Sequence, residues 1–230
     1  MLPSLSIIVP VLNEARGICQ TLQALAPLRA RGVQVIVVDG GSTDDTVQQA
    51  RLVCDAAAWQ VIESPAGRAA QMNAGAKVAS AATLLFLHAD TVLPAAADIL
   101  VARALNRGTH QWGRFDVRIA GKHRMLRVVA AFMNRRSRWS GIATGDQALF
   151  MTRAAFDQVD GFPPQALMED IEISKRLLQL SRPACLAARV VTSGRRWETR
   201  GVWRTIVLMW RLRFADWWGS SPQRLAELYR

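Results

Sequence analysis

The sequence predicts an α/β fold in which a mostly parallel sheet is flanked by helices. Residues 6–10, 33–39 and 84–88 are short runs made almost entirely of apolar residues, which is typical of strands buried on both faces. Helical patterns separate these runs, as where Ile18 and Leu22 recur at helical spacing. Because strands that alternate with helices in this way form βαβ units, we expect the sheet to be parallel over most of its width.

The remaining elements follow from the same reasoning, although the pattern is less regular beyond Pro94. No internal repeat or linker interrupts the chain, and 230 residues with 50% hydrophobic content suit one well-filled core. We therefore expect a single domain over residues 1–230. The further helices expected lie at 43–54, 67–79, 95–107, 122–136, 153–159 and 169–180, and the further strands at 59–62, 112–119 and 148–151.

The positive charge of the chain is concentrated in its second half. The net charge is +11, and arginines crowd the segments 114–138 and 195–213. Such a localised basic face favours anionic partners, which include nucleic acids, phosphorylated small molecules and anionic membrane surfaces. Charge alone does not choose among these three classes.

The cysteines and the N-terminus exclude several classes of protein. Cys19, Cys54 and Cys185 are odd in number and widely separated, which suits neither a disulfide framework nor a zinc site. We expect them to be reduced, small apolar core residues in a cytoplasmic protein. Residues 1–4 lack a basic start and lead directly into a strand, so no secretory signal is predicted. No stretch reaches the roughly 18 uncharged apolar residues that a spanning helix needs.

Acidic residues follow the predicted strands at the positions where ligands bind to open α/β sheets. Asp39 ends one buried strand, and Asp90 follows another. His88 and Asp90 are two residues apart in an extended segment, so both can face one ligand, such as a divalent metal ion. The alternative is that Asp90 caps the helix expected to begin near Pro94. A further acidic pair, Glu169 and Asp170, begins a later helix.

Five ordered blocks of the sequence form a recognisable pattern, at 6–14, 37–46 and 67–76, then at 88–90, and at 161–162 with 169–170. Together they resemble the family 2 glycosyltransferases, inverting enzymes with the Rossmann-like GT-A fold. Among such enzymes the chain looks closest to small bacterial transferases that accompany radical-SAM and selenium- or arsenic-handling proteins, some of them linked to arsenosugar biosynthesis. The resemblance implies a nucleotide-binding half at 5–92, an acceptor half at 93–190 and a C-terminal helical extension at 191–230.

The resemblance assigns the donor nucleotide to the first half of the chain. Asp39 matches the aspartate that accepts the N–H of uracil, although an aspartate at this position can also simply form a turn. Arg68 matches a basic contact to the nucleotide, and its alternative is an ordinary surface arginine. Pro10, Leu12 and Glu14 fall in the same implied nucleotide pocket.

The resemblance also implies a metal ion and a catalytic base. Asp90 matches the last aspartate of the family's Asp-x-Asp motif and is the expected ligand for Mn²⁺ or Mg²⁺ on the donor diphosphate. His88 replaces the first aspartate, and we expect it to be a structural residue that hydrogen-bonds nearby backbone. Asp170 matches the general base, with Glu169 as a supporting residue; the alternative is that both merely favour a helix N-terminus. Asp146 falls on the implied acceptor side.

The C-terminal third carries two further features. Residues 193–197 are similar to the Gln-x-x-Arg-Trp element of processive family members, but serine replaces the glutamine. Arg195 or Arg196 can reach a diphosphate or remain at the surface. A helical stripe beyond residue 202 can lie at a membrane interface, form a homodimer or dock on the protein's own core. Its apolar members are Trp203, Val207, Trp210, Phe214 and Trp217, with Arg204 and Arg211 along one edge and Arg213 along the other.

The function that these observations favour is inverting, metal-dependent transfer of a sugar from a nucleotide-diphosphate donor, expected to be a UDP-sugar, to a small acceptor. We expect the protein to act in the cytoplasm or at the inner face of the membrane, without a nucleic-acid partner. One alternative is a nucleotidyltransferase, which usually has a Gly-rich basic loop after its first strand, where this chain has residues 11–14. The other is a basic nucleic-acid-binding protein, although no recognised nucleic-acid module is visible.

Overall fold

A computed structural model describes residues 5–53 and 59–218, and these residues contain one eight-stranded mixed sheet. The strand order is β3-β2-β1-β4-β7-β6-β8-β5. Pairing is parallel from β3 through β4 and between β6 and β8, while β7 is antiparallel to both of its neighbours. The strands are β1 (Leu5–Val11), β2 (Gln34–Asp39), β3 (Trp59–Glu63), β4 (Thr83–Phe86), β5 (Thr91–Val92), β6 (Trp112–Ala120), β7 (Phe150–Thr152) and β8 (Ala184–Ser193).

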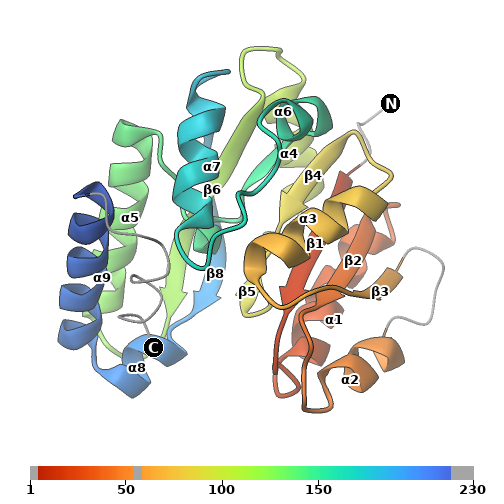
Figure 1. Cartoon of the computed structure of the whole chain (residues 1–230), viewed down its shortest axis with the longest axis horizontal. Helices are drawn as coiled ribbons and strands as arrows, with labels where there is room; N and C mark the ends of the chain where they lie inside the picture. The colour runs from red at the N-terminus through yellow and green to blue at the C-terminus, as the bar shows by residue number, and fades with distance from the viewer. Residues whose placement is uncertain (1–4, 54–58, 219–230) are drawn as a thin grey trace.

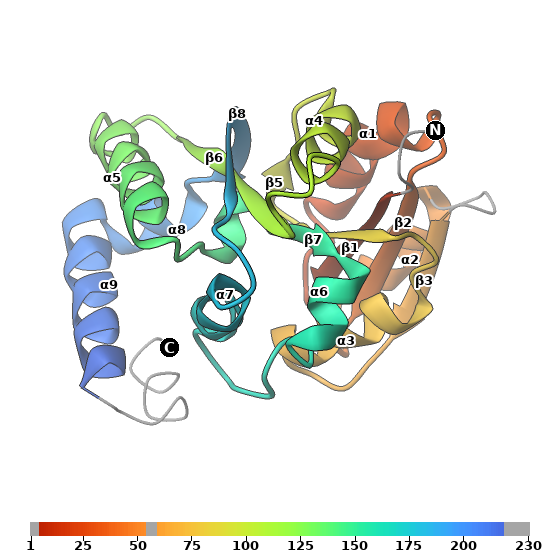
Figure 2. The ribbon, with the colours of Figure 1, turned by 90° about the horizontal axis from the view of Figure 1, so that it is seen from above.

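Helices cover both faces of this sheet (Figures 1 and 2). Seen from above, α1 and α4 lie on one side of the strands, while α3, α6 and α7 lie on the other. At the end of the molecule furthest from β3, α5 and α9 run side by side in both views. The helices are α1 (Ile18–Arg29), α2 (Thr46–Val53), α3 (Arg68–Val78), α4 (Ala97–Leu105), α5 (Met125–Ser140), α6 (Arg153–Gln158), α7 (Glu169–Leu178), α8 (Arg195–Arg200) and α9 (Val202–Trp217), with a 3₁₀ turn η1 at Gly145–Gln147.

Two hydrophobic clusters fill the spaces between the sheet and its helices. Along β1, Ile7 and Val9 point into the cluster that contains Leu22 of α1. Ile8 points the opposite way, into the cluster that contains Met72 of α3. This alternation is the period of two expected for a strand, and it explains why the strand is apolar at consecutive positions. The expectation of an α/β fold with a mostly parallel sheet is confirmed.

One long strand was not expected from the sequence. β8 pairs with β6 over most of its length, and a backbone hydrogen bond from Ser193 to the carbonyl of Asp90 brings its end beside the segment that follows β4. Much of β8 is only partly buried, and its residues include several alanines and an arginine, so it lacks the apolar run that predicted the other strands. The end of β8, where residues 191–230 begin, therefore lies beside Asp90.

Other sequence-based expectations need smaller corrections. The strand expected at 148–151 begins later, at Phe150, because Ala148 has a positive φ of 47° at the end of η1. Cys19 and Cys185 are free thiols that are only partly buried, and Cys19 packs against the core cluster; Cys54 lies outside the described residues. Within residues 5–53 and 59–218, no helix is long and apolar enough to cross a membrane.

Candidate functional site

The loops after β1 and β2 form one side of the site. The two strands are parallel neighbours with Val11 opposite Asp39, so the loops that follow them emerge at the same edge. Side-chain oxygens then tie one loop to backbone amides of the other. Thr43 N–H donates to Asn13 Oδ1 at 2.9 Å, Asn13 N–H to Ser42 Oγ at 2.9 Å, Glu14 N–H to Thr46 Oγ1 at 2.8 Å and Ala15 N–H to Asp44 Oδ2 at 3.2 Å.

The carboxylate of Asp39 shapes the turn that follows β2. Its Oδ2 accepts the backbone N–H groups of Gly41 and Ser42, each at 2.9 Å, and its Oδ1 accepts the Ser42 hydroxyl. Asp39 therefore has the turn-forming role that was one of its two alternatives. A carboxylate can accept about four hydrogen bonds, so these three contacts leave capacity for one more donor. The predicted contact between Asp39 and the uracil of a donor nucleotide stays a prediction.

A buried glutamine joins the ends of β1 and β2, and sequence reasoning missed it. The Gln71 side-chain amide of α3 donates to the carbonyls of Val11 at 2.7 Å and Val38 at 2.8 Å. Gly40 makes room for it, because a Cβ at this position would lie 2.8 Å from Gln71 Cδ. Gln71 stands next to Met72 on the side of α3 that faces the sheet, and a polar residue at such an apolar position was the available signal.

The carboxylate of Asp170 lies at the start of α7, facing the 3₁₀ turn. Its Oδ2 accepts the backbone N–H of Gly145 at 2.8 Å, and its Oδ1 accepts that of Ile171 at 2.8 Å. Burial, together with the negative charge of Glu169, raises the pKa of Asp170 to about 6, against the lowering effects of the Gly145 hydrogen bond and of Arg68 and His88. The group is therefore ionised at neutral pH and remains a usable proton acceptor.

Arg68 connects the two halves of the chain. Its Nη1 lies 3.3 Å from Glu169 Oε1, although the two residues are separated by 101 positions in the sequence. Burial lowers the pKa of Arg68, but the charges of Glu169, Asp170 and Asp146 raise it by more. The Glu169 side chain is only 4% exposed whereas that of Arg68 is 46% exposed, so the guanidinium neutralises a buried carboxylate while still reaching solvent. Arg68 is thus more than an isolated surface arginine.

His88 has a different partner from the one that the sequence suggested. Its Nδ1 lies 3.2 Å from Asp146 Oδ1, so the expectation that the ring hydrogen-bonds nearby backbone is wrong. The ring also packs against Gly145 so closely that a Cβ at this position would overlap His88 Nε2. Only tertiary structure could reveal this pair, since 58 residues separate its members. Residues around this contact border a small hollow of about 10 Å³, lined by Met72, Phe86, His88, Gly145, Leu149, Phe162, Glu169 and Asp170.

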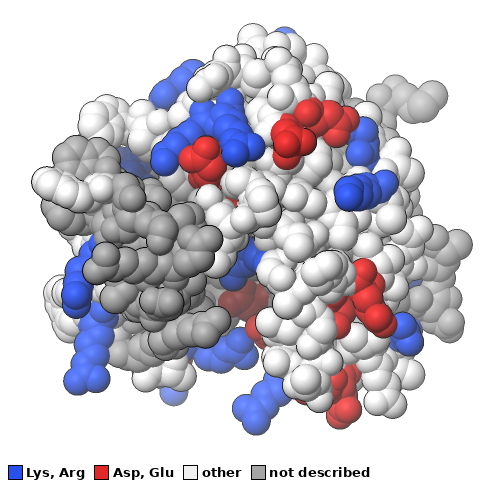
Figure 3. Space-filling view, in the orientation of Figure 1, with Lys and Arg blue, Asp and Glu red and all other residues white. Residues whose placement is uncertain are grey.

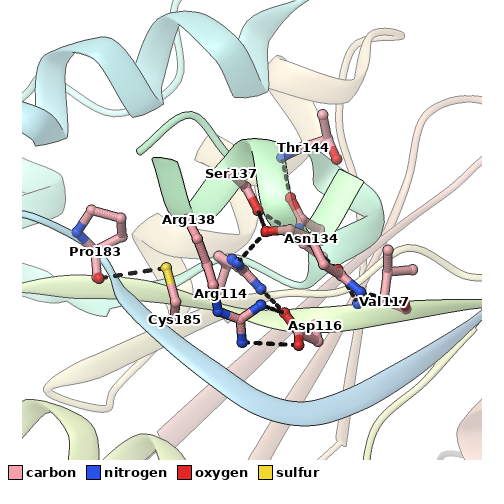
Figure 4. A network of polar contacts seen from close by, with 10 residues as sticks. Arg114, Asp116, Val117, Asn134, Ser137, Arg138, Thr144, Pro183 and Cys185 are labelled. Carbon is pink, nitrogen blue, oxygen red and sulfur yellow. Dashed lines mark hydrogen bonds and ion pairs between the residues drawn. The ribbon is translucent and has the colours of Figure 1, made fainter. Parts of the chain in front are cut away.

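Buried polar contacts behind the hollow hold η1 in place (Figure 4). Gln147 donates to Ser137 Oγ at 3.0 Å and accepts the backbone N–H of Thr144 at 3.3 Å, while Asn134 of α5 makes two hydrogen bonds to the backbone of Val117. Below them, Asp116 of β6 pairs with the guanidinium groups of both Arg114 and Arg138. The turn that presents Gly145 and Asp146 therefore rests on α5 and β6.

Asp90 is exposed in the segment between β4 and β5, and its role as a metal ligand stays a prediction. It does not cap α4, because that helix begins after Ala96 without a side-chain cap. Its Oδ1 accepts a long hydrogen bond of 3.4 Å from Thr91 Oγ1. In the described part of the chain, no group of three or more His, Cys, Asp or Glu residues gathers around one point. A cation here would thus take most of its ligands from substrate and water, as Mg²⁺ usually does.

The C-terminal extension also reaches this edge. Arg195, which follows β8, has its Nη2 3.3 Å from Glu14 Oε1 across 181 residues of sequence. Pro10 is partly buried at the end of β1, and Leu12 is exposed just beyond it. In Figure 3, basic and acidic side chains meet in a recess near the middle of the view, between the two halves of the molecule.

Sequence comparison identifies the family that this geometry represents. The family model described as glycosyl transferase family 2 matches residues 6–159, which include β1 to β7 and the loops described above. The chain therefore belongs to glycosyl transferase family 2. A relative from Mycobacterium tuberculosis, a PGL/p-HBAD biosynthesis glycosyltransferase, is 34% identical over 112 residues, which cover 47% of this chain and 43% of the relative. The chain thus matches less than half the length of this relative.

Solved structures share the fold at lower sequence identity. The mannosyltransferase PcManGT from Pyrobaculum calidifontis, in complex with GDP-Man and Mn²⁺, superposes with a TM-score of 0.69 at 20% identity, covering 100% of this chain and 69% of that one. S. aureus TarS 1-349 in complex with UDP-GlcNAc gives 0.67 at 19% identity, covering 83% of this chain and 58% of TarS. Both comparisons support the GT-A fold.

Proposed function

We propose that this chain transfers a glycosyl group with inversion from a nucleotide-diphosphate sugar to an acceptor hydroxyl. The observation that carries the proposal is Asp170, a partly buried carboxylate whose pKa is raised to about 6 and whose orientation is fixed by the N–H of Gly145. A general base works best when its pKa lies close to the operating pH. The two assigned halves of the chain, 5–92 for the donor and 93–190 for the acceptor, are part of this proposal.

In this mechanism Asp170 removes one proton. The acceptor oxygen forms a bond to the anomeric carbon while the bond from that carbon to the diphosphate oxygen breaks, and the hydroxyl proton passes to Asp170. Gly145 keeps the carboxylate pointing into the hollow, and Glu169 acts through its ion pair with Arg68, which offers the exposed part of its guanidinium to the donor. Asp146 orients the ring of His88 on the acceptor side.

Asp90 is the residue that would hold a divalent metal ion. Its carboxylate is exposed and makes only a long contact with Thr91 among the hydrogen bonds found in the described part of the chain, so its oxygens suit a hard cation. When bound, Mn²⁺ or Mg²⁺ would offset the negative charge that develops on the leaving diphosphate. PcManGT was solved with Mn²⁺, which supports the assignment by fold likeness.

The donor that we propose is a UDP-sugar bound over the loops after β1 and β2. Asp39 would accept the N–H of uracil with its remaining acceptor capacity, and Pro10, Leu12 and Glu14 would line the pocket. TarS was solved with UDP-GlcNAc and PcManGT with GDP-Man, so either nucleotide fits this fold. Membership of the small bacterial radical-SAM or arsenosugar-associated type belongs to the same proposal.

A thermal-shift screen of the full chain tests the proposal. The ligands are UDP, UDP-sugars and GDP-Man, each with and without Mn²⁺. A nucleotide at about 100 times its dissociation constant stabilises the folded protein by about 2.7 kcal/mol, which gives a clear rise in Tm. We expect the largest rise with a uridine nucleotide plus Mn²⁺, and release of UDP when an acceptor is added.

Two controls make the outcome specific. Asp90→Asn should abolish the part of the shift that depends on Mn²⁺. Asp98→Asn, which removes a carboxylate of α4 that is 11% exposed and pairs with Arg31, should leave it unchanged. A larger shift with GDP-Man than with any uridine nucleotide would show that the nucleobase of the donor is guanine and not uracil. Absence of a shift with every nucleotide would contradict the proposed donor class.

A further inference from the structure

The exposed aromatic side chains of the molecule are concentrated at one end. Among the residues whose side chains the structure describes, five aromatic residues are exposed, and all belong to α5, to α9 or to the position after α9. Both views show these two helices side by side, at the end of the molecule opposite β3 (Figures 1 and 2). Aromatic residues exposed in one region mark interaction sites more often than exposed aromatics scattered singly. The five are Phe132, Trp139, Trp203, Trp210 and Trp218.

The exposed side of α9 is aromatic. Trp203, Val207 and Trp210 recur at intervals of four and three residues, so they share one face of the helix, and they are 65%, 56% and 74% exposed. Val202 and Thr205 are buried on the opposite side. The sequence-based alternative in which this stripe docks on the protein's own core is therefore wrong for these three residues. The side chains of Phe214, Trp217 and Arg213 lie outside the described part.

The exposed side of α5 repeats this arrangement. Val128, Phe132 and Trp139 recur at intervals of four and seven residues, and Phe132 and Trp139 are 70% and 85% exposed. Leu126 and Ala130 on the other side of the helix pack into the core cluster. The neighbouring helices α5 and α9 thus each have apolar residues on two sides, one side facing the core and the other facing solvent.

Basic residues surround these aromatic stripes, and acidic residues are missing from the two segments. Exposed arginines lie beside the α5 stripe at Arg124, Arg127 and Arg135, and beside the α9 stripe at Arg204 and Arg211. The sequence contains no Asp or Glu from 121 to 140 or from 201 to 211. Figure 3 agrees, because the left-hand edge of the view, where α9 lies, shows basic and no acidic side chains outside the grey atoms.

We propose that the exposed faces of α5 and α9 dock the protein onto an anionic lipid surface. Tryptophan is enriched at the level of the lipid headgroups, where its apolar body and its polar N–H are both satisfied, and arginine pairs with anionic headgroups. A second copy of the chain is a poorer occupant. A two-fold interface through this face would bring arginines against arginines, and residues 121–140 and 201–211 contain no Asp or Glu to pair with them. The inference does not depend on the proposed glycosyl transfer, because none of its residues is assigned to the donor pocket, the base or the metal ion.

Co-sedimentation of the full chain with lipid vesicles tests this docking. The probes are vesicles of phosphatidylcholine alone and vesicles with phosphatidylcholine and phosphatidylglycerol in equal parts. We expect binding to the anionic vesicles that weakens with salt and is at least about tenfold weaker for phosphatidylcholine alone. Replacing Trp203 and Trp210 by serine should weaken the binding about tenfold or more. Replacing Arg204 and Arg211 by glutamine should weaken it about fivefold per arginine.

Matched surface variants serve as controls. Leu52→Ser with Val78→Ser removes exposed apolar side chains from α2 and α3, and Arg103→Gln removes an exposed arginine from α4, so both should bind like the parent protein. An unchanged Tm for every variant shows that the fold is retained. The inference is overturned if the parent protein does not bind anionic vesicles, or if the tryptophan variant binds as well as the controls. It is also overturned if sedimentation velocity shows a lipid-free dimer that the tryptophan variant dissociates.

Discussion

The proposed donor side and the proposed acceptor side of the site are built in different ways. On the donor side, backbone amides and short polar side chains from two adjacent loops satisfy one another, as in the contact of Thr43 with Asn13. On the acceptor side, charged side chains from separate elements pair directly, as Arg68 does with Glu169 and His88 with Asp146. The difference teaches that this chain fixes the loops after β1 and β2 by hydrogen bonds between the two loops, whereas Glu169 is positioned by a charge pair across 101 residues.

The strongest test of the acceptor side is Asp170→Asn. Removal of a general base should lower the transfer rate by about 10²–10⁴-fold, while the Tm rise caused by the donor should persist because Asp170 does not contact the donor loops. Rates of nucleoside diphosphate release and thermal shifts measure the two effects. Glu172→Gln on the same helix, which breaks only exposed pairs with Lys175 and Arg176, should change the rate by less than about twofold. Loss of the donor-induced shift in Asp170→Asn would remove this residue from the base role.

A second variant tests whether Gln147 supports the 3₁₀ turn η1, which presents Gly145 to Asp170. Gln147→Ala would remove the hydrogen bonds that the Gln147 side chain makes with the N–H of Thr144 and with the hydroxyl of Ser137. This loss should lower the free energy of unfolding by about 1–3 kcal/mol. Because Gly145 then loses its firm position, we also expect transfer to slow by about tenfold or more. Urea unfolding and initial rates measure both changes. The exposed Gln158→Ala is the control, and equal losses in the two variants would contradict the support role.

The packing of the donor side predicts a loss of stability with little change in chemistry. In Gly75→Ala, the new Cβ would lie 2.5 Å from Ile8 Cγ2 and 3.0 Å from Val38 Cγ2, so α3 must move away from the sheet. Overpacking of this kind costs about 1–3 kcal/mol, offset by up to about 1 kcal/mol of helix propensity. Gly17→Ala has open space around its Cβ and should change stability by less than about 0.5 kcal/mol. Similar urea midpoints for the two variants would show that Gly75 does not pack tightly against Ile8 and Val38.

The raised pKa of Asp170 gives a pH dependence of both activity and stability. Because its pKa rises from 3.8 to about 6 on folding, the folded state binds more protons between these values, and stability falls as pH increases through that interval. At about pH 8, Asp170→Asn should therefore increase the free energy of unfolding by about 1–2 kcal/mol, allowing for partial exposure of the group, and below about pH 4 this gain should vanish. Transfer by the parent protein should fall below about pH 6. A gain in stability that is independent of pH would contradict this assignment.

The smallest effect is expected at the contact between the C-terminal extension and the donor loop. Arg195 and Glu14 form an ion pair in which the arginine side chain is 59% exposed, so Arg195→Gln should lower the free energy of unfolding by less than about 1 kcal/mol. Thermal unfolding at low and high salt measures the change, and it should disappear at high salt. A loss that persists at high salt would mean that Arg195 contributes through packing.

The sequence by itself determined the architecture of the first half and the identity of its loops. Apolar runs such as 84–87 bury both faces of a strand, and a glycine pair such as Gly40 and Gly41 permits one kind of turn, so local chemistry was sufficient there. The same reasoning placed Asp39 and Asp90 at the carboxyl edge of the sheet. It also marked Glu169 and Asp170 as the start of a helix.

Only the tertiary structure decided which charges meet. The partner of His88 is 58 residues away and that of Arg68 is 101 residues away, and no periodicity in the sequence encodes such separations. β8 was not predicted, because a strand that is buried along only part of its length needs no uniform apolar run. Its pairing with β6 carries Arg195 to Glu14. The environment that raises the pKa of Asp170 exists only once burial and these long-range contacts are in place.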